Sequence, residues 1–386
     1  MADSSDETPG AEQGISGSPP GRYSSFQNER AARKVLESTA RANIAAFHEY
    51  EIVPSMLRKE ANKRSLQVEL FGVKHSSPLL LAPIGVQGIV HPDGEEAVAK
   101  AAQELGIGMI LSTAATRSIE KVAQASGDGL RWFQLYWPPE NEITISLLRR
   151  AKASGYQALV CTLDTFSLGY RPRDLEQSYL PFLQGQGLQN LFTDPAFMKI
   201  NEAQIRDEDQ HMRLVQLSVA GLAQTSSGIF RTWEDLGFLR KHWEGPLIIK
   251  GIQRVADAEK AIDFGIDGII VSNHGGRQVD GATASLRALD RITSSPKVIN
   301  SKITILFDSG IRTGADIIKA LAPGAHAVLL GRPYVWGSAL GGKAGVEHVI
   351  KSILADLEIS MALCGKGRIA ELDRSILASA RARARL

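Results

Sequence analysis

The sequence predicts an α/β protein folded as a TIM (β/α)8 barrel, and three observations support this prediction. From Pro78 onward, short aliphatic runs alternate with amphipathic stretches, which is typical of a parallel sheet covered by helices on both faces. Eight such runs occur over roughly 250 residues, the number and size expected of this barrel, whereas six would favour a doubly wound sheet. No run is followed by the Gly-x-Gly-x-x-Gly turn of a Rossmann domain or by a Walker loop.

Composition excludes several classes of protein. The chain has 386 residues, 44% of them hydrophobic, and a net charge of +2, so no overall field directs it to nucleic acid or to a membrane. Its two cysteines, Cys161 and Cys364, provide neither a disulfide framework nor a metal site. No apolar run approaches the ~18 residues of a membrane span, and the polar N-terminus lacks the features of a signal peptide. We therefore expect an intracellular protein that acts on a small molecule.

The N-terminal part is expected to lie outside the barrel. Residues 1–25 are rich in Ser, Gly, Pro and Asp, which predicts a disordered tail, and residues 26–386 are expected to form one domain. From Glu29 to Tyr50, apolar side chains recur at helical spacing, which predicts a helix packed on the barrel.

The barrel strands are predicted from the apolar runs in chain order. The segment from Phe166 to about Thr232 is longer than an ordinary connection, and its position after the fourth strand favours an active-site lid. After the eighth strand, Val346 to Leu386 is expected to form helices that close the barrel. The predicted strands are Leu79 to Ala82, Met109 to Ser112, Trp132 to Tyr136, Ala158 to Thr162, Leu247 to Lys250, Ile269 to Ser272, Ile303 to Phe307 and Ala327 to Leu330.

Polar or glycine residues end all eight runs. In a TIM barrel, the active site lies at the C-terminal ends of the strands, so we expect these residues to surround one site. In strand order they are Pro83, Ile84 and Gly85; Ser112; Gln134 and Tyr136; Thr162 and Asp164; Lys250; Ser272, Asn273 and His274; Asp308, Ser309 and Gly310; and Gly331 and Arg332.

Two of these strand ends indicate chemistry on an anion. His274 can accept a proton near neutral pH, and Arg277 can hold a carboxylate through two hydrogen bonds. Taken alone, the residues from Gly268 to Asp280 are equally consistent with a strand followed by a solvated Gly-rich turn. Lys250 interrupts an apolar run, and a buried lysine needs an anionic partner.

The last two strand ends predict a phosphate site. The stretches DSGIRTGAD and LLGRP each combine glycine-exposed backbone N–H groups with an arginine, Arg312 or Arg332. Barrels often bind phosphate after strands seven and eight. The alternative is turn glycines beside surface arginines.

At this point the motifs resemble a known family. LLLAPIG, HPDGE, FQLY, TLDT, RPRD, IIKGI, SNHGGRQ-x-D, FDSGIRTGAD and LLGRP, in this order, resemble the FMN-dependent 2-hydroxy-acid oxidase/dehydrogenase family from about Asn43 to Leu372. The variant FDSGIRTGAD, with RPRDL and the TDPAF loop, is most similar to lactate 2-monooxygenase-like members. The resemblance implies FMN as the cofactor and oxidation of an L-2-hydroxy acid to the 2-keto acid, or to its oxidative decarboxylation product, with O2 as acceptor.

The resemblance also implies roles at the substrate. His274 would be the base, and Asp164 would stabilise the imidazolium that forms, although a residue at this position could instead cap a following helix. Arg171 and Arg277 would hold the substrate carboxylate, and Tyr136 would hydrogen-bond near the reacting centre.

For the cofactor, the resemblance implies that Lys250 stabilises negative charge on the reduced flavin. Ser112, Gln134 and Thr162 would bond the isoalloxazine ring, although Ser112 and Thr162 could also be ordinary polar strand ends. The phosphate end would be held by Asp308, Arg312, Gly331 and Arg332, and the remaining cofactor contacts would be Pro83, Ile84, Gly85, Ser272, Ser309 and Gly310.

Two departures qualify this picture. Relatives usually have a Tyr and a Gly-rich loop where this chain has the shortened NERAARKVLES, which leaves open a catalytically weakened flavin- or ligand-binding barrel. A phosphate-binding isomerase barrel is a further alternative. Ala114 replaces a Trp found in the family, which predicts room for larger substrates. The terminal Ala384-Arg385-Leu386 is similar to a peroxisomal address, so the expected compartment is the cytoplasm or the peroxisome, and a homo-oligomer is expected.

Overall fold

The computed structural model describes residues 38–171, 174, 176, 178–202, 205 and 209–379. Three predictions therefore lie wholly or partly outside the described residues: the tail at 1–25, the first part of the helix from Glu29, and the C-terminal Ala384-Arg385-Leu386. The shortened segment NERAARKVLES also lies outside them, except for its final serine, Ser38.

Eight parallel strands close into a barrel in the order β10-β11-β4-β5-β6-β7-β8-β9, which confirms the predicted fold class. The strand bounds differ from the predicted ones by one or two residues at some ends, most clearly at the fifth barrel strand, which continues to Ile252. The strands are β4 (Leu79–Leu81), β5 (Gly108–Ser112), β6 (Arg131–Leu135), β7 (Leu159–Thr162), β8 (Leu247–Ile252), β9 (Gly268–Val271), β10 (Thr304–Phe307) and β11 (Ala327–Leu330).

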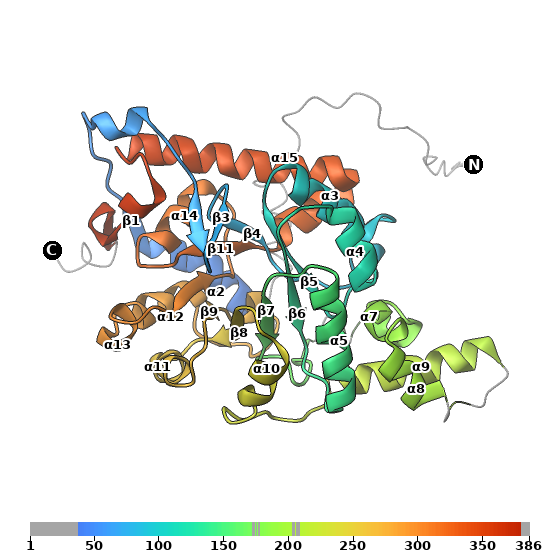
Figure 1. Ribbon diagram of the computed structural model, residues 1–386. Coiled ribbons are helices and arrows are strands. Elements are labelled where there is room, and N and C mark those ends of the chain that lie inside the picture. The colour runs from blue at the N-terminus through green and yellow to red at the C-terminus, as the bar shows by residue number, and fades with distance from the viewer. Residues whose placement is uncertain are drawn as a thin grey trace, which may run out of the picture.

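Helices surround the barrel, and the longest of them, α15, packs against α3 and α14 (Figure 1). The helices are α2 (Ser38–Ala46), α3 (Gly94–Glu104), α4 (Ile119–Ser126), α5 (Asn141–Ala153), α7 (Gln189–Phe192), α8 (Pro195–Glu202), α9 (Gln210–Thr225), α10 (Leu236–His242), α11 (Val255–Asp263), α12 (Ser285–Ile292), α13 (Pro296–Ile299), α14 (Gly314–Leu321) and α15 (Arg332–Leu363).

Both faces of the barrel strands are buried, which explains why the strands are continuous apolar runs in the sequence. One set of side chains fills the barrel interior, including Leu80, Ile110 and Ile270, and the other set packs against the helices. The β2 (Val68–Leu70) and β3 (Val73–His75) hairpin closes the N-terminal end of the barrel, since the Phe71 ring between its strands lies against Gly268 at the start of β9. The opposite end is left for the polar strand ends.

The first and the last strand of the described chain pair with each other outside the barrel. The helix predicted to continue to Tyr50 instead ends at Ala46, and a short 3-10 turn follows it. Tyr50 opens strand β1 (Tyr50–Ile52), which pairs antiparallel with β12 (Leu377–Ser379). That backbone pairing satisfies the N–H and C=O groups that a continued helix would have bonded internally. The predicted C-terminal helices are therefore α15, two 3-10 turns and a strand.

The long segment after β7 carries its own helices. α7, α8 and α9 lie together beside α5 at one side of the barrel (Figure 1). Among all the helices that the structure describes, none is long and apolar enough to cross a bilayer.

Candidate active site at the C-terminal ends of the strands

A chain of hydrogen bonds joins the ends of three neighbouring strands. Ser112 Oγ donates to Gln134 Oε1 at 3.1 Å, and Gln134 Nε2 donates to Thr162 Oγ1 at 3.0 Å. Strand register explains the alignment, because Ser112 pairs with Gln134 across β5 and β6. All three side chains are buried, so they form a fixed polar wall at this side of the barrel mouth.

Lys250 has the anionic partners that its sequence context requires. Its Nζ atom lies 3.9 Å from Asp164 Oδ2 and 3.7 Å from Asp308 Oδ2, and the residue is only 4% exposed. Burial alone would lower the pKa of Lys250, but the two carboxylates outweigh burial and raise that pKa above its ordinary value. The lysine is therefore a permanent buried cation at the barrel mouth.

His274 and Asp164 form a hydrogen-bonded pair, although 110 residues separate them. His274 Nδ1 lies 2.9 Å from Asp164 Oδ1, and Thr165 Oγ1 lies 3.1 Å from the same nitrogen. The histidine is held in a 3-10 turn, η6 (His274–Gly276), at a positive φ of 59°, with its backbone N–H donating to Ser272 Oγ at 3.0 Å. A non-glycine residue in this backbone region is strained, which is characteristic of functional sites.

The two members of this pair are held in complementary charge states. Burial, and then the charge of Lys250, lower the pKa of His274, so the imidazole is neutral near pH 7. Burial would raise the pKa of Asp164, yet Lys250 and His274 outweigh it and hold that pKa well below its usual range. The residues after Asp164 form a turn, so the alternative role as a helix cap is wrong. The pair is a neutral imidazole beside an ionised carboxylate.

Arg171 and Arg277 lie close together, as predicted. Arg171 Nε donates to the Arg277 carbonyl at 2.9 Å, and both guanidinium groups approach one carboxylate, that of Asp174, at 3.8 and 4.0 Å. Tyr136 is buried enough that its pKa is raised, and the charges that act on its hydroxyl are those of Lys250, Asp164 and the two arginines. The Tyr136 hydroxyl is therefore under the influence of Lys250, Asp164 and both arginines.

The residues of the predicted phosphate site lie at the ends of the last two strands. Arg312 is 7% exposed, with its guanidinium 5.2 Å from the centre of the Trp336 ring, and Arg332 Nη1 donates to the Gly275 carbonyl at 3.0 Å. Gly310 has a φ of 108°, and a side chain at this position would lie 2.9 Å from the Asn43 carbonyl. The alternative of turn glycines beside surface arginines is wrong for Arg312, because its side chain is buried.

The other predicted cofactor residues support these positions. A Cβ on Gly85 would lie 2.6 Å from the Ala114 carbonyl, and a Cβ on Gly331 would meet only Ile84, at 3.7 Å. Pro83, Ile84 and Gly85 thus pass between the ends of β5 and β11. Ser309 Oγ donates to Asp308 Oδ1 at 2.7 Å and accepts from Gly275 N at 3.0 Å, which ties the seventh strand end to the histidine turn.

These groups fit a flavin mononucleotide. The phosphate of FMN needs cations and exposed backbone N–H groups. Arg312 follows Gly310 just before α14, and Arg332 follows Gly331 at the start of α15. The ring of FMN needs hydrogen-bonding groups on a rigid wall, which Ser112, Gln134 and Thr162 form. Lys250 is the buried cation suited to a ring that gains negative charge on reduction.

Several positioning residues escaped the sequence analysis. Asn43 on α2 and Asn273 exchange two amide hydrogen bonds, at 2.8 and 2.7 Å, and both are buried. Gln278 Nε2 donates to the Asp164 carbonyl at 2.7 Å. Asn190, on the long segment, donates to the carbonyls of Ser112 and Thr113 at 3.1 and 3.0 Å. Gln278 had a signal, its place in SNHGGRQ, and Asn273 was already expected at the site, whereas Asn43 and Asn190 had none, because an amide in a helix or loop is ordinarily a solvated side chain.

The sequence predicts a larger substrate pocket near Ala114, and in the structure other groups lie at this position. Ala114 is 5% exposed, and a Cβ on Gly187, from the long segment, would lie 2.9 Å from its carbonyl and 2.5 Å from Val86. The long segment therefore packs against the place where the family has a larger side chain.

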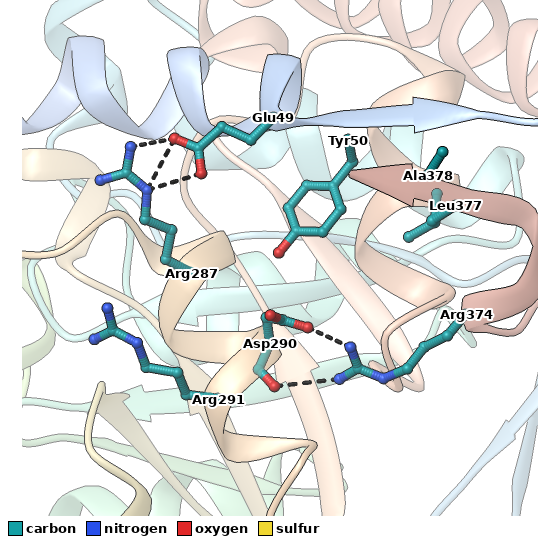
Figure 2. A pocket seen from close by; sticks show the side chains of 8 residues that line it. All are labelled: Glu49, Tyr50, Arg287, Asp290, Arg291, Arg374, Leu377 and Ala378. Carbon is teal, nitrogen blue, oxygen red and sulfur yellow. Dashed lines mark hydrogen bonds and ion pairs between the residues drawn. The ribbon is translucent and has the colours of Figure 1, made fainter. Parts of the chain in front are cut away.

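A separate pocket of about 400 Å³ lies between the β1–β12 ribbon and α12 (Figure 2). Its charged side chains are Glu49 with Arg287, Asp290 with Arg374, and Arg291; the dashed lines in Figure 2 mark the first two pairs. Within the described ranges, no group of three or more His, Cys, Asp or Glu side chains is placed to hold a metal ion.

Comparison with known proteins agrees with this geometry. The family model described as FMN-dependent dehydrogenase matches residues 28–379. An FMN-dependent alpha-hydroxy acid dehydrogenase of Penicillium citrinum is 46% identical over 342 residues, covering 88% of this chain and 83% of the relative. An L-lactate oxidase of Lysinibacillus sphaericus is 41% identical over 329 residues, covering 85% and 82%.

Solved structures give the same result. A lactate oxidase of Pediococcus acidilactici superposes with a TM-score of 0.74 at 34% identity, covering 88% of this chain and 86% of that one. A mandelate oxidase superposes with a TM-score of 0.76 at 32% identity, covering 92% and 98%.

Proposed function

This chain belongs to the family of FMN-dependent dehydrogenases, and from that premise we propose that it oxidises an L-2-hydroxy acid to the 2-keto acid, with O2 reoxidising the flavin. The protein is an oxidoreductase that acts on CH–OH groups, and FMN is its cofactor. The observation that carries the proposal is the contact of a neutral His274 with an ionised Asp164, beside the buried cation Lys250.

In this proposal His274 is the base. Because Asp164 is ionised, it can only accept hydrogen bonds, so His274 Nδ1 carries a hydrogen and Nε2 presents a lone pair. Nε2 accepts a proton from the substrate, and Asp164 stabilises the imidazolium that results. The contact with Thr165 and the strained η6 turn hold the ring in this orientation.

Arg171 and Arg277 bind the substrate carboxylate in this proposal. Their joint approach to the Asp174 carboxylate supports it, because the same two guanidinium groups can face a carboxylate on a ligand. Tyr136 then lies beside the carbon that reacts and can hydrogen-bond its oxygen.

The remaining residues hold the cofactor. When bound, FMN supplies the acceptor for the two electrons that leave the substrate carbon. Ser112, Gln134 and Thr162 fix the plane of its ring, and Arg312 and Arg332 neutralise its phosphate. Pro83, Ile84, Gly85, Ser272, Asp308, Ser309, Gly310 and Gly331 complete the proposed cofactor site, with Lys250 stabilising negative charge on the ring.

The comparisons disfavour the weakened barrel, because the matching family model and relatives are described as FMN-dependent dehydrogenases and oxidases. Closest similarity to lactate 2-monooxygenase-like members stays a prediction. Reduction of the FMN-reconstituted protein is the test: anaerobic L-lactate, glycolate or L-mandelate is expected to bleach the flavin absorbance. Failure of all three acids, with normal flavin content, would contradict the proposed function.

Aerobic products distinguish the subgroups. Pyruvate with peroxide from L-lactate indicates an oxidase, whereas acetate with CO2 indicates a monooxygenase. A higher kcat/KM for L-mandelate than for L-lactate would support the larger substrate pocket predicted from Ala114, and the reverse order would contradict it.

We further propose that residues 26–386 form one FMN-binding domain after a tail at 1–25, that the protein is a homo-oligomer, and that Ala384-Arg385-Leu386 directs it to peroxisomes rather than leaving it in the cytoplasm. A rice relative, 35% identical, is described as a peroxisomal (S)-2-hydroxy-acid oxidase. A fluorescent fusion with and without the last three residues tests the address, and light scattering tests the oligomer.

A further inference from the structure

The side chain of Thr165 touches both members of the base pair. Its Oγ1 lies 2.9 Å from Asp164 Oδ1 and 3.1 Å from His274 Nδ1, and the residue is 4% exposed. His274 Nδ1 is itself 2.9 Å from the same Asp164 Oδ1, so the three polar atoms form a closed triangle.

Hydrogen count decides the direction of each contact. The ionised carboxylate of Asp164 has no hydrogen to give, so the single hydroxyl hydrogen of Thr165 is donated to Oδ1. The one Nδ1–H of His274 faces both oxygens, and the charged Oδ1 at 2.9 Å is a stronger acceptor than the neutral hydroxyl at 3.1 Å. One carboxylate oxygen therefore accepts from two donors, and its negative charge is shared between the histidine and the threonine.

We propose that Thr165 is a positioning residue that weakens the hold of Asp164 on the protonated form of His274, and so lowers the pH at which His274 becomes free to accept a proton. This inference rests on the proposed role of His274 as the base. A hydrogen bond to Oδ1 reduces the charge that this oxygen offers to the imidazolium.

The other groups near the His274 imidazole act on different atoms from Thr165. The charged groups that act on the imidazole are Asp164, Lys250 and Asp308. Lys250 approaches the other carboxylate oxygen, Asp164 Oδ2, at 3.9 Å, beyond hydrogen-bond distance. Arg332 reaches the neighbouring backbone, at the Gly275 carbonyl. Among the described residues, the side-chain hydrogen bonds to Asp164 Oδ1 come from His274 and Thr165.

The matched variants are Thr165→Val and Thr165→Ser. Valine keeps the size and β-branching of threonine and removes the hydroxyl, whereas serine keeps the hydroxyl. In Thr165→Val, the acid limb of kcat/KM is expected to move to higher pH by about one unit, the size expected for loss of one hydrogen bond to a charged group. In Thr165→Ser, the limb is expected to stay at the wild-type position.

A direct readout separates this role from a purely structural one. The 15N chemical shifts of the His274 imidazole in the FMN-loaded protein report its titration, with His274→Gln used to assign the signals. The midpoint is expected to rise in Thr165→Val by the same amount as the acid limb. Flavin content and melting temperature are measured alongside, and they are expected to change little, because valine fills the same space.

Three outcomes would overturn the inference: an unchanged midpoint in Thr165→Val, a midpoint that falls, or a Thr165→Ser variant that behaves like Thr165→Val. If the wild type holds FMN yet oxidises no 2-hydroxy acid, the proposed function fails, whereas the imidazole titration still decides the role of Thr165.

Discussion

Two charged clusters of this molecule differ in burial and in pairing. The mouth cluster, defined as Lys250, Asp164, Asp308 and His274, is almost fully buried, and its lysine stands 3.7 and 3.9 Å from the two carboxylates. The peripheral cluster is defined as Glu49 with Arg287 and Asp290 with Arg374. Its arginine side chains are 37% and 46% exposed. In Figure 2 each of its guanidinium groups makes direct hydrogen bonds to its carboxylate partner.

The difference shows what each cluster does. Peripheral pairs are bonded directly and hydrated, so they fasten the ribbon of β1 and β12 to α12 at small net gain. The mouth cluster takes charges out of water without ideal pairing, an arrangement that does not favour stability. Because the charges of the mouth cluster do not fully neutralise one another, their electrostatic field can act on a ligand. Breaking one cluster while the other stays intact tests this difference.

The largest expected effect is on activity when the base is removed. His274→Gln keeps a hydrogen-bonding side chain near Asp164 but cannot accept a proton from substrate, so kcat is expected to fall by about 10²–10⁴-fold. Steady-state oxidation of L-2-hydroxy acids measures the fall. Flavin content should stay at the wild-type level, and Arg374→Met, in the peripheral cluster, should keep wild-type kcat. A His274→Gln enzyme with near-normal kcat would assign the base to another residue.

Removal of the buried cation is expected to have the largest effect on stability. Lys250→Met leaves Asp164 and Asp308 buried without their shared cation, which is expected to lower the free energy of unfolding at pH 7 by about 3–5 kcal/mol. Denaturant titration measures the change. Part of the loss should be recovered at acidic pH, where the carboxylates can be protonated. An unchanged free energy of unfolding would show that removing a cation from the mouth cluster costs no more than removing one from the peripheral cluster.

The pH dependence follows from the lowered pKa of His274. Its folded pKa lies below its unfolded value of about 6.5, so the stability gained from the neutral imidazole is present above that value and is lost as pH falls through the folded pKa. The acid limb of kcat/KM is therefore expected below pH 6.5. The ionised carboxylate of Asp164 also contributes stability that is lost as pH falls, but at lower pH, because the pKa of Asp164 is depressed as well. An acid limb above 6.5 would mean that Asp164 outweighs burial and Lys250.

The contrast between the clusters also explains what the sequence could predict. Barrel strands were predictable because both of their faces are buried, which leaves continuous apolar runs such as Leu247 to Ile249. The pairing of Lys250 with anionic groups was predictable because a charge interrupts such a run, and Asp164 and Asp308 are those groups.

Residues that position the site carried no such signal. Asn43 bonds Asn273 across 230 residues, and Asn43 is an unremarkable amide in its local sequence. Thr165 follows Asp164 directly, and only the closed turn of the chain brings it to His274. Peripheral pairs such as Asp290 with Arg374 join segments 84 residues apart, and surface charges have no preferred partner in a sequence. Long-range pairing of neutral or exposed polar groups is set by the fold.

The smallest expected effect is on the peripheral cluster. Arg374→Met removes the hydrogen bonds from α12 to the chain before β12, but its guanidinium is 46% exposed, so Asp290 can be hydrated in its place. The expected loss in free energy of unfolding is at most about 1 kcal/mol, with kcat and flavin content unchanged. Asp290→Asn is the matched control and should give a similar small loss. A loss as large as that of Lys250→Met would show that exposure does not separate the two clusters, because the junction of the two chain ends would then stabilise the barrel as strongly as the site does.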